Sequence, residues 1–537
     1  MSSADRGPSE SFSSSDAQAV VLDPNSHSHN DKTCPVEEKM ETDSGDSSHA
    51  RYTGSGTRED PYIVVWDEDD PEDPYNWSKT RKWIITTQLA LTTFTVSFSS
   101  SSYSGGLEDI TRDLNVSDEL AVLGISLYVL GFAVGPLLFA PMGEMYGRRI
   151  IFLITVGLYT PLHIGGAFAK NITTVLIVRL LTGIFGASPL TNAGGAVADI
   201  FTPRERGLAS AIYAAVPFLG PVPAYAVIGP IVGGFVAESS LGWHFNFWLM
   251  LLLGALSLTM GYFVAPETYA PVLLRRRANH LMKRSNGTIC YMSKYDIGRS
   301  TTFMKTMKIN LSRPFAFLIT EPIVLLFAIY ISVVYGTLYA LFSAFPIVFE
   351  TRRGWSAGSG GLAFLGVGAG ISVGTATAQV QNTIYRRAMD KSPTGRAAPE
   401  ARLHTAMMGG VLVPIGLFWF AWTADPPVHW IVPIIAGFPF GQGVCQILQS
   451  STAYLMDAYE IYFASAIAAT IVLRSIFAAV FPVIAPTMFN HLGDAWGMSI
   501  FAFLGLVCTP IPFLFWNYGE VIRSKSKYAY KETDDVS

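Results

Sequence analysis

The sequence predicts an all-α membrane protein with twelve transmembrane helices in two pseudo-symmetric six-helix bundles. Half of the 537 residues are hydrophobic and only 15% are charged, whereas about 25% is usual for a soluble domain. Apolar windows of about 20 residues, the length that crosses a bilayer, recur along the chain. Basic residues gather in alternate connections, as they do in the cytosolic loops of membrane proteins. These three observations together predict the fold class.

The apolar windows fall into two groups of six. We place the first group near residues 83–103, 120–140, 150–169, 174–198, 207–236 and 244–265, and the second near 318–345, 358–380, 403–423, 429–455, 462–486 and 494–517. The segment between the groups, residues 266–317, carries ten Lys or Arg against two acids, which assigns it to the cytosol. An even number of spans then puts both termini in the cytosol, and we expect a multi-pass protein of the plasma membrane.

The domain organisation follows from these windows. Residues 1–66 are predicted to be a disordered acidic cytosolic tail, because they are rich in Ser, Asp and Glu. Five parts complete the predicted chain: this tail, an N-terminal bundle over 67–265, a basic central loop over 266–317, a C-terminal bundle over 318–517 and a cytosolic tail over 518–537. Outside the acidic tail the chain is net basic, which suits loops that face anionic lipid better than a nucleic-acid partner. A monomer is expected.

The connection between the second and third spans carries a carboxylate, a glycine and an arginine pair, namely Glu144, Gly147, Arg148 and Arg149. Two spanning helices joined by so few residues form a tight hairpin, and Gly147 supplies the backbone freedom for it. This arrangement resembles the loop between helices 2 and 3 of the major facilitator superfamily, whose pattern is G-x-x-x-(D/E)-(R/K)-x-G-(R/K)-(R/K). After the eighth span, Tyr385-Arg386-Arg387 is a weak echo of this connection, as expected for two related halves.

The fifth span contains the run Gly229-Pro230-Ile231-Val232-Gly233-Gly234. Proline kinks a helix and glycines let a neighbouring helix approach closely, so simple packing is one explanation. The full G-P-x-x-G-G pattern also resembles the antiporter motif of proton-coupled exporters. With Pro266-Glu267-Thr268 after the sixth span and the Tyr454–Tyr459 segment, the chain resembles fungal twelve-spanner drug:proton antiporters over about residues 60–520.

Two arginines lie within predicted spans, where a charge is costly and normally faces protein or a water-filled cavity. Arg179, in the fourth span, either reaches the headgroups or faces a cavity, and we favour the cavity because the residues around it resemble the family's span-4 motif. Arg474 lies near the centre of the eleventh span, too deep to reach the headgroups easily. We expect it to pair with a polar group inside the bundle, in a role that is either structural or functional.

Three acids close or open predicted spans on the cytosolic side: Asp199, Glu321 and Asp457. Singly, each is explained as an ordinary interfacial charge. With Glu144 and Arg148 they are predicted to form an inner gate whose charge pairs stabilise the outward-facing state. No acid lies in the middle of a span, so the sequence does not identify the proton carrier. Glu321 is the first candidate and Asp457 the second.

Polar and aromatic stripes indicate where a substrate cavity lies. The tenth span carries amides at helical spacing, Gln442, Gln446 and Gln449, and the seventh carries Tyr335, Tyr339 and Phe342 on one face. Aromatic stripes are more often packing than ligand sites, and for this stripe we weigh the two explanations equally. An amide that faces lipid, in contrast, has no hydrogen-bond partner. Two N-glycosylation sequons, at Asn115 and Asn171, fall in the predicted outer loops.

The resemblance implies a proton-coupled efflux transporter of small organic compounds that works by alternating access. The alternatives are a polyamine or organic-acid carrier, a proton-coupled uptake symporter and, more remotely, a non-transporting membrane sensor. An enzyme is not expected, because the spans contain no paired nucleophile and base and no metal-ligand set. No phosphate-binding G-x-x-x-x-G-K-(S/T) loop is present, so the expected energy source is the proton gradient, with no cofactor. The expected partners are a small-molecule substrate, protons and membrane lipid.

Overall fold

The structure is a computed structural model that describes residues 52–201, 225–297, 303–391, 397–459 and 462–529. The chain divides into two units. The larger comprises Pro71–Tyr269 and Phe303–Ser537, and the smaller comprises Met1–Asp70 and Ala270–Thr302. This division replaces the predicted linear order of tail, bundle and loop. The small unit combines a segment from before the first span with a segment from the predicted central loop.

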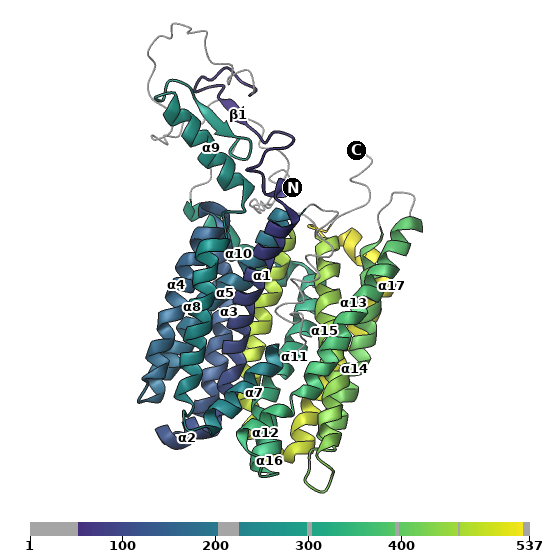
Figure 1. The fold of residues 1–537 in the computed structure, drawn as a ribbon. Helices are drawn as coiled ribbons and strands as arrows, with labels where there is room; N and C mark the ends of the chain where they lie inside the picture. The colour runs from purple at the N-terminus through teal and green to yellow at the C-terminus, as the bar shows by residue number, and fades with distance from the viewer. Residues whose placement is uncertain (1–51, 202–224, 298–302, 392–396, 460–461, 530–537) are drawn as a thin grey trace, which may run out of the picture. The chain divides into compact units, whose positions relative to one another are not determined.

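The first half of the large unit is a helical bundle (Figure 1). Its long helices are α1 (Lys79–Ser102), α3 (Asp118–Tyr146), α4 (Arg148–Ala167), α5 (Ile172–Ile200), α7 (Tyr225–Glu238) and α8 (His244–Val264). The short η3 (Pro74–Asn76) precedes α1, and η4 (Tyr103–Gly106) and α2 (Leu107–Leu114) join α1 to α3. The start of the predicted fifth span, residues 207–224, lies outside the described residues.

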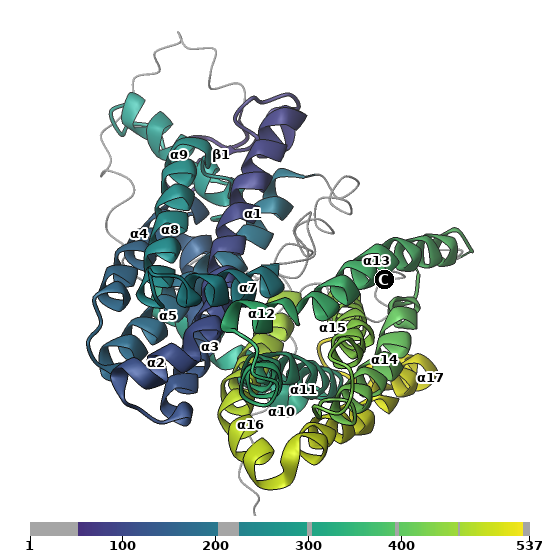
Figure 2. The same ribbon diagram turned by 60° about the horizontal axis from the view of Figure 1, so that its bottom comes forward.

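The second half repeats the bundle and lies beside the first in Figures 1 and 2. After α10 (Phe303–Thr320) it comprises α11 (Pro322–Phe345), η5 (Pro346–Thr351), α12 (Ala357–Leu362), α13 (Leu365–Lys391), η6 (Pro399–Arg402), α14 (His404–Ala421), α15 (Ile431–Ala458), α16 (Phe463–Cys508) and α17 (Pro510–Lys525). Gly493 interrupts the helical backbone of α16 with φ 78°. Glycine adopts this conformation freely, so Gly493 allows a kink that separates two helices. The segment Phe463–Lys525 therefore contains both the eleventh and the twelfth spans.

The described helices account for the predicted spans. Nine of them are long and apolar enough to cross a membrane, with Phe463–Lys525 counted as one. Helix α1 has 24 residues, but its many Ser and Thr make it less apolar. Helix α7 is short because its predicted first part lies outside the described residues. With these two helices, and with the division of Phe463–Lys525 at Gly493, the predicted twelve-helix fold in two halves is confirmed.

Local sequence signals explain where several of these helices begin. Ser78, Ser117 and Asn171 are N-caps whose side chains accept hydrogen bonds from the backbone N–H groups of Arg81, Leu120 and Thr174. Ser and Asn suit this position because their oxygen satisfies an N–H that has no partner within the helix. Between α3 and α4 the chain reverses at Gly147, whose φ is 107°, so the predicted tight hairpin is present.

Strand β1 (Tyr62–Val64) of the small unit pairs in parallel with β2 (Tyr291–Ser293), and α9 (Ala270–Arg284) packs with this two-stranded sheet. Its core contains Val64, Leu274, Ala278 and Tyr291. The prediction of disorder up to residue 66 is therefore wrong for β1, and the predicted loop 266–317 contains folded structure. The apolar run that starts at Tyr62 gains its partner strand and helix only from the central loop. The low hydrophobicity of residues 1–66 therefore predicted disorder for a segment that folds through contacts distant in sequence. Residues 1–51 lie outside the described residues.

Candidate functional site

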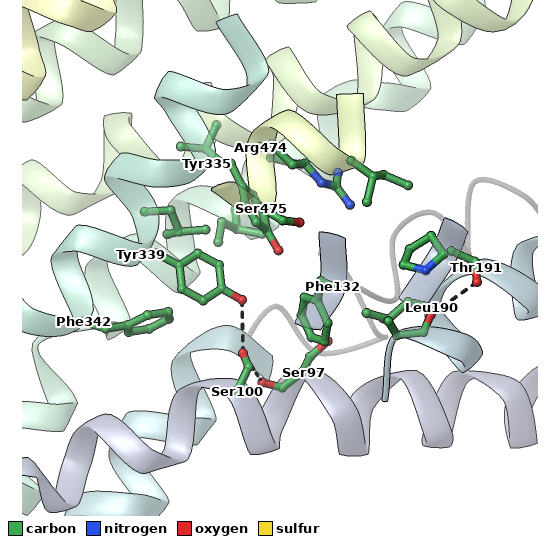
Figure 3. A pocket seen from close by; sticks show the side chains of 17 residues that line it. Ser97, Ser100, Phe132, Leu190, Thr191, Tyr335, Tyr339, Phe342, Arg474 and Ser475 are labelled. Atoms are coloured by element: carbon green, nitrogen blue, oxygen red, sulfur yellow. Dashed lines mark hydrogen bonds between the residues drawn. The ribbon is translucent and has the colours of Figure 1, made fainter. Parts of the chain in front are cut away.

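A cavity lies between the two halves of the large unit, with side chains from both halves in its walls (Figure 3). Helices α1, α3 and α5 form the first wall, and α11, α13, α15 and α16 form the second. The lining residues are Ser97, Ser100, Phe132, Pro136, Ala187, Leu190, Thr191, Tyr335, Leu338, Tyr339, Phe342, Ile371, Val444, Cys445, Ile471, Arg474 and Ser475. A cavity at the interface of two related bundles is where transporters of this architecture bind substrate.

The aromatic stripe of α11 forms one side of this cavity. The ring centroids of Tyr335 and Tyr339 are 5.1 Å apart, and those of Tyr339 and Phe342 are 5.3 Å apart at an interplanar angle of 85°. The hydroxyl of Tyr339 and the Oγ of Ser100 are hydrogen-bonded at 3.1 Å, which links α11 to α1 across the two halves (Figure 3). The residues of the stripe therefore pack against one another and also line the cavity, so both explanations weighed from the sequence apply.

Arg474 also lines the cavity, beside Tyr335 and with Phe132 on the opposite wall (Figure 3). Its guanidinium carbon lies 4.9 Å from the centroid of the Tyr335 ring, in a cation–π contact. Its Nε is buried and makes no hydrogen bond in the described structure. We expected a polar partner from within the bundle. The structure instead provides the guanidinium with an aromatic face, in a residue that lines the cavity.

Arg179 does not line the cavity, which corrects the expectation for this residue. It is fully buried in the first half. Its guanidinium donates to the backbone carbonyls of Gly124 at 3.0 Å, Ser99 at 2.6 Å and Ser100 at 3.0 Å. It also lies over the rings of Tyr103 and Tyr128, 4.7 and 4.2 Å from their centroids. Arg179 thus ties α5 to α1 and α3 instead of reaching substrate or headgroups.

Gln446 of α15 likewise contacts a neighbouring helix. Gln446 is buried, and its Nε2 donates to the Oγ1 of Thr377 on α13 at 2.9 Å. Neither Gln442 nor Gln446 is among the residues that line the described cavity, whereas Val444 and Cys445 of the same helix are. In this cavity α15 contributes Val444 and Cys445 to the wall, and Gln446 instead joins α15 to α13.

The hairpin motif between α3 and α4 is held by two carboxylates. The Nε of Arg148 lies 2.5 Å from the Oδ2 of Asp199, and both side chains are mostly buried. The backbone N–H of Arg148 donates to Oε1 of Glu267 at 3.0 Å. A Cβ at Gly147 would collide with the Glu267 carboxylate, so this close approach requires glycine. Two motif residues contribute differently: Arg149 donates to the carbonyl of Tyr262 at 3.0 Å, and Glu144 is half-buried on the last turn of α3.

The second half contains an equivalent pair. The Nε of Arg402, just before α14, lies 2.8 Å from the Oδ2 of Asp457, near the end of α15. Arg402 also lies over the ring of Tyr385 at 3.4 Å from its centroid. Helices α4 and α5 of the first half correspond to α14 and α15 of the second, so the two ion pairs occupy related positions. The true counterpart of Arg148 is therefore Arg402, and not the Arg386-Arg387 pair that the sequence suggested.

The predicted inner gate does not form as one cluster in this structure. Arg148 and Asp199 pair within the first half, and Arg402 and Asp457 pair within the second. The buried carboxylate of Glu321 accepts hydrogen bonds from the Tyr459 hydroxyl at 2.8 Å and the Ser526 hydroxyl at 2.6 Å, again within the second half. Each of these contacts stabilises one bundle by itself.

Sequence reasoning missed two residues of these networks. Glu267 belongs to the Pro-Glu-Thr run after the sixth span, which was noted for its resemblance but given no role. Arg402, which pairs with Asp457, was likewise given no role. Close to it in the chain, the Glu400 carboxylate accepts two hydrogen bonds from Arg523, each at 2.9 Å. A signal was available in both places, namely a carboxylate or arginine directly beside the end of a span.

The glycine-rich motif of α7 is at a close helix crossing. A Cβ on Gly229 or Gly233 would collide with α1 at Ser101 or Ser102. One on Gly234 would collide with the Ala357 carbonyl of α12. From the other side of this contact, a Cβ on Gly361 of α12 would lie 2.7 Å from the Pro230 carbonyl oxygen of α7. The motif therefore permits two contacts at once, one within the first half and one between the halves (Figure 2).

The two predicted glycosylation sequons lie at helix termini. Asn115, the residue after α2, is exposed and has φ 49°. Asn171, also exposed, uses its Oδ1 to cap α5 through the N–H of Thr174 at 2.8 Å. Asn115 is therefore the less constrained of the two.

Comparison with known proteins agrees with this architecture. The sequence profile of the Major Facilitator Superfamily matches residues 89–482. The chain is 48% identical over 485 residues to the major facilitator superfamily multidrug transporter mdrA of Aspergillus fumigatus, covering 89% of this chain and 78% of that protein. It is 47% identical over 479 residues to the MFS-type efflux pump MFS2 of Trichophyton rubrum, with 89% and 79% covered. With the major facilitator-type transporter sorT of Penicillium rubens it shares 42% over 514 residues, with 94% and 95% covered.

Two solved structures share the fold. The xylose transporter XylE from E. coli, in a partially occluded inward-open conformation, matches with a TM-score of 0.57 at 16% identity, covering 81% of this chain and 99% of that one. The human organic anion transporter MFSD10 matches with a TM-score of 0.52 at 16% identity, covering 81% of this chain and 100% of that one. At these identities the likeness concerns the fold alone.

Proposed function

The chain belongs to the major facilitator superfamily, and from this premise we propose that it exports small organic compounds by alternating access, driven by the proton gradient. Family members are membrane transporters and not enzymes. The relatives described above, with 42–48% identity over most of the chain, include proteins named as a multidrug transporter and an efflux pump. These names support export as the direction of transport. We place the protein in the plasma membrane as a monomer with both termini in the cytosol.

The observation that carries the proposal is the cavity whose walls come from both halves. In alternating access the two halves rock against each other around a site at their interface. Close contacts between the halves lie at Gly234 with Ala357 and at Gly361 with Pro230. At the end of the bundle that carries Arg148, the ion pairs lie within single halves. Such a pattern supports a state that is closed at the α7–α12 end and poised to exchange substrate at the other.

Coupling to protons is the finer part of the proposal. Two acids at the predicted cytosolic end are candidate carriers, and each holds contacts that protonation would change. Glu321 accepts hydrogen bonds from Tyr459 and Ser526, and Asp457 pairs with Arg402. A neutral Asp457 loses the charge-assisted part of its ion pair. Protonation there would loosen the end of α15, which is what coupling to a conformational change requires.

A panel assay tests the proposal. Cells that lack their own drug exporters would express the chain and be loaded with radiolabelled antifungals, aromatic metabolites, organic acids and polyamines. We expect lower steady-state accumulation of at least one class than in cells with an empty vector, and faster efflux after reloading. Higher accumulation of a compound would identify an uptake carrier. Unchanged accumulation of every class, with the protein at the cell surface, would contradict transport and favour the sensor alternative.

A further inference from the structure

The cavity contains a cation, Arg474, for which the described residues provide no ion-pair partner. We infer that it binds amphipathic organic anions, compounds with an aromatic body and one carboxylate, and that Arg474 pairs with the carboxylate. This inference rests on the proposed function and deepens it by naming the substrate class. Of the alternative functions, it favours a carrier of organic acids over a carrier of polyamines, which are cations.

The charge balance of the cavity is the first argument. Of the seventeen described residues that line it, Arg474 alone carries a formal charge, and none is Asp or Glu. Residues 202–224, which the structure does not describe, contain one acid in the sequence, Glu205, between Arg204 and Arg206 in the predicted cytosolic loop. Asp457, near the end of α15, and Asp494, just after the kink at Gly493 in α16, each pair with an arginine, Arg402 and Arg352 respectively. A substrate cation would therefore be repelled by Arg474 and would find no carboxylate among the described lining residues.

The state of the Arg474 side chain is the second argument. A charged group within a membrane protein is costly unless a partner compensates it. The Tyr335 ring, 4.9 Å away, supplies part of that compensation. Nε is nevertheless buried without a hydrogen bond. A carboxylate has two acceptor oxygens whose geometry matches the planar guanidinium fork, so a bound carboxylate would compensate the charge that the Tyr335 ring compensates only in part.

Arg179 provides an internal comparison. It too is a buried arginine within a span, but its guanidinium donates to three backbone carbonyls and lies over two tyrosine rings. Its donors are satisfied by protein, and it does not line the cavity. The fold therefore satisfies a buried arginine where its role is structural. Arg474 lines the cavity and has no ion-pair partner among the described residues, and this is the feature that a ligand would complete.

The apolar walls define the rest of the ligand. Tyr335, Tyr339 and Phe342 present their rings from α11, and Phe132 faces them from α3. Aromatic rings favour offset or edge-to-face contact with another ring. An aromatic or otherwise flat apolar body fits between these walls, with its carboxylate toward Arg474. A small, fully hydrated acid lacks the body that the walls would bury.

A matched set of three probes tests the inference: naphthoate, naphthamide and naphthylmethylamine, which share one ring system and differ in charge. Efflux of each would be measured from cells that express the full-length chain, together with the melting temperature of the purified protein in detergent with each probe. We expect naphthoate to leave fastest and to raise the melting temperature most. In Arg474→Gln the ratio of naphthoate to naphthamide efflux should fall about tenfold or more, and the stabilisation by naphthoate should disappear. The ratio is decisive because a general loss of activity lowers both rates.

Arg387→Gln is the matched control, since it removes one positive charge from an exposed position on α13 that does not line the cavity. Its efflux ratio should equal that of the unmodified protein. Faster efflux of naphthylmethylamine than of naphthoate, or an unchanged ratio in Arg474→Gln, would overturn the inference and leave export itself standing. If none of the three probes leaves faster than from cells with an empty vector, and the wider panel of compounds also shows no export, the proposed function fails together with the inference.

Discussion

The Nε of Arg148, at the start of α4, lies 2.5 Å from the Oδ2 of Asp199, near the end of α5. In the second half, the Nε of Arg402, just before α14, lies 2.8 Å from the Oδ2 of Asp457, near the end of α15. The pair therefore belongs to the repeated unit of the fold. Each bundle fastens its own helix ends with an arginine and an aspartate, which lets the bundle move as one body.

The first prediction concerns this fastening. Arg148→Ala should reduce export by at least about tenfold at normal surface abundance, because it leaves the mostly buried Asp199 carboxylate without its cation. Arg149→Ala is the control, since its bond to the Tyr262 carbonyl is exposed. Efflux and surface labelling would be measured together. Normal transport by a double Glu144→Ala/Arg148→Ala variant would remove the motif from the mechanism.

A second prediction concerns the contact between α7 and α12. Gly234→Ala places a methyl group against the Ala357 carbonyl, so the two halves can no longer approach there and export should fall several-fold. Gly157→Ala is a matched control on α4, because a Cβ at Gly157 meets nothing within 4 Å. Efflux rates normalised to surface abundance test this pair. Equal rates for the two variants would show that closure does not need this contact.

Arg179 is predicted to stabilise the first half without touching substrate. Arg179→Leu leaves the buried carbonyls of Ser99 and Ser100, at the end of α1, short of a donor, at a cost on the order of 1–3 kcal/mol for each unsatisfied group. We expect a clearly lower melting temperature and lower abundance, with the relative rates for different substrates unchanged. Thermal unfolding of the full-length protein in detergent measures the first effect. A variant with normal stability but altered substrate preference would return Arg179 to the binding site.

Orientation in the membrane is the subject of the fourth prediction. Asn115 is exposed in the predicted outer loop after α2 and should carry an N-linked glycan, so Asn115→Gln should increase electrophoretic mobility by the amount that glycosidase treatment does. Asn286, in the predicted cytosolic segment, should remain bare. Mass spectrometry of the peptides that contain these residues distinguishes the two sites. A glycan on Asn286 would reverse the assigned topology.

The helices and the hairpin glycine were predictable because they depend on local signals. Hydrophobic length defines a span, and a tight reversal between two spans requires a residue such as Gly147, which tolerates positive φ. The rotation of a helix about its axis is a different matter. Gln446 looked like a cavity residue, yet it bonds to Thr377 on a neighbouring helix, and only the packed bundle determines which face of α15 meets the cavity.

The role of Arg179 escaped the sequence for a related reason. Its partners Ser99 and Ser100 contribute backbone carbonyls, which every residue has and no motif marks. They lie in the last turn of α1, where carbonyls lack an intrahelical donor. The counterpart of Arg148 was also misplaced, because α13 continues to Lys391 and the equivalent arginine follows only after η6. Pairings between distant segments, including β1 with β2, likewise depend on tertiary structure.

The central claim, export driven by the proton gradient, is tested most directly by efflux from energised cells in which ATP is held constant while a protonophore is added. A gradient-driven carrier loses its driving force at that moment. The account predicts that efflux of a transported compound falls to the rate of cells with an empty vector. Efflux that persists with the protonophore and stops only when ATP is depleted would contradict it.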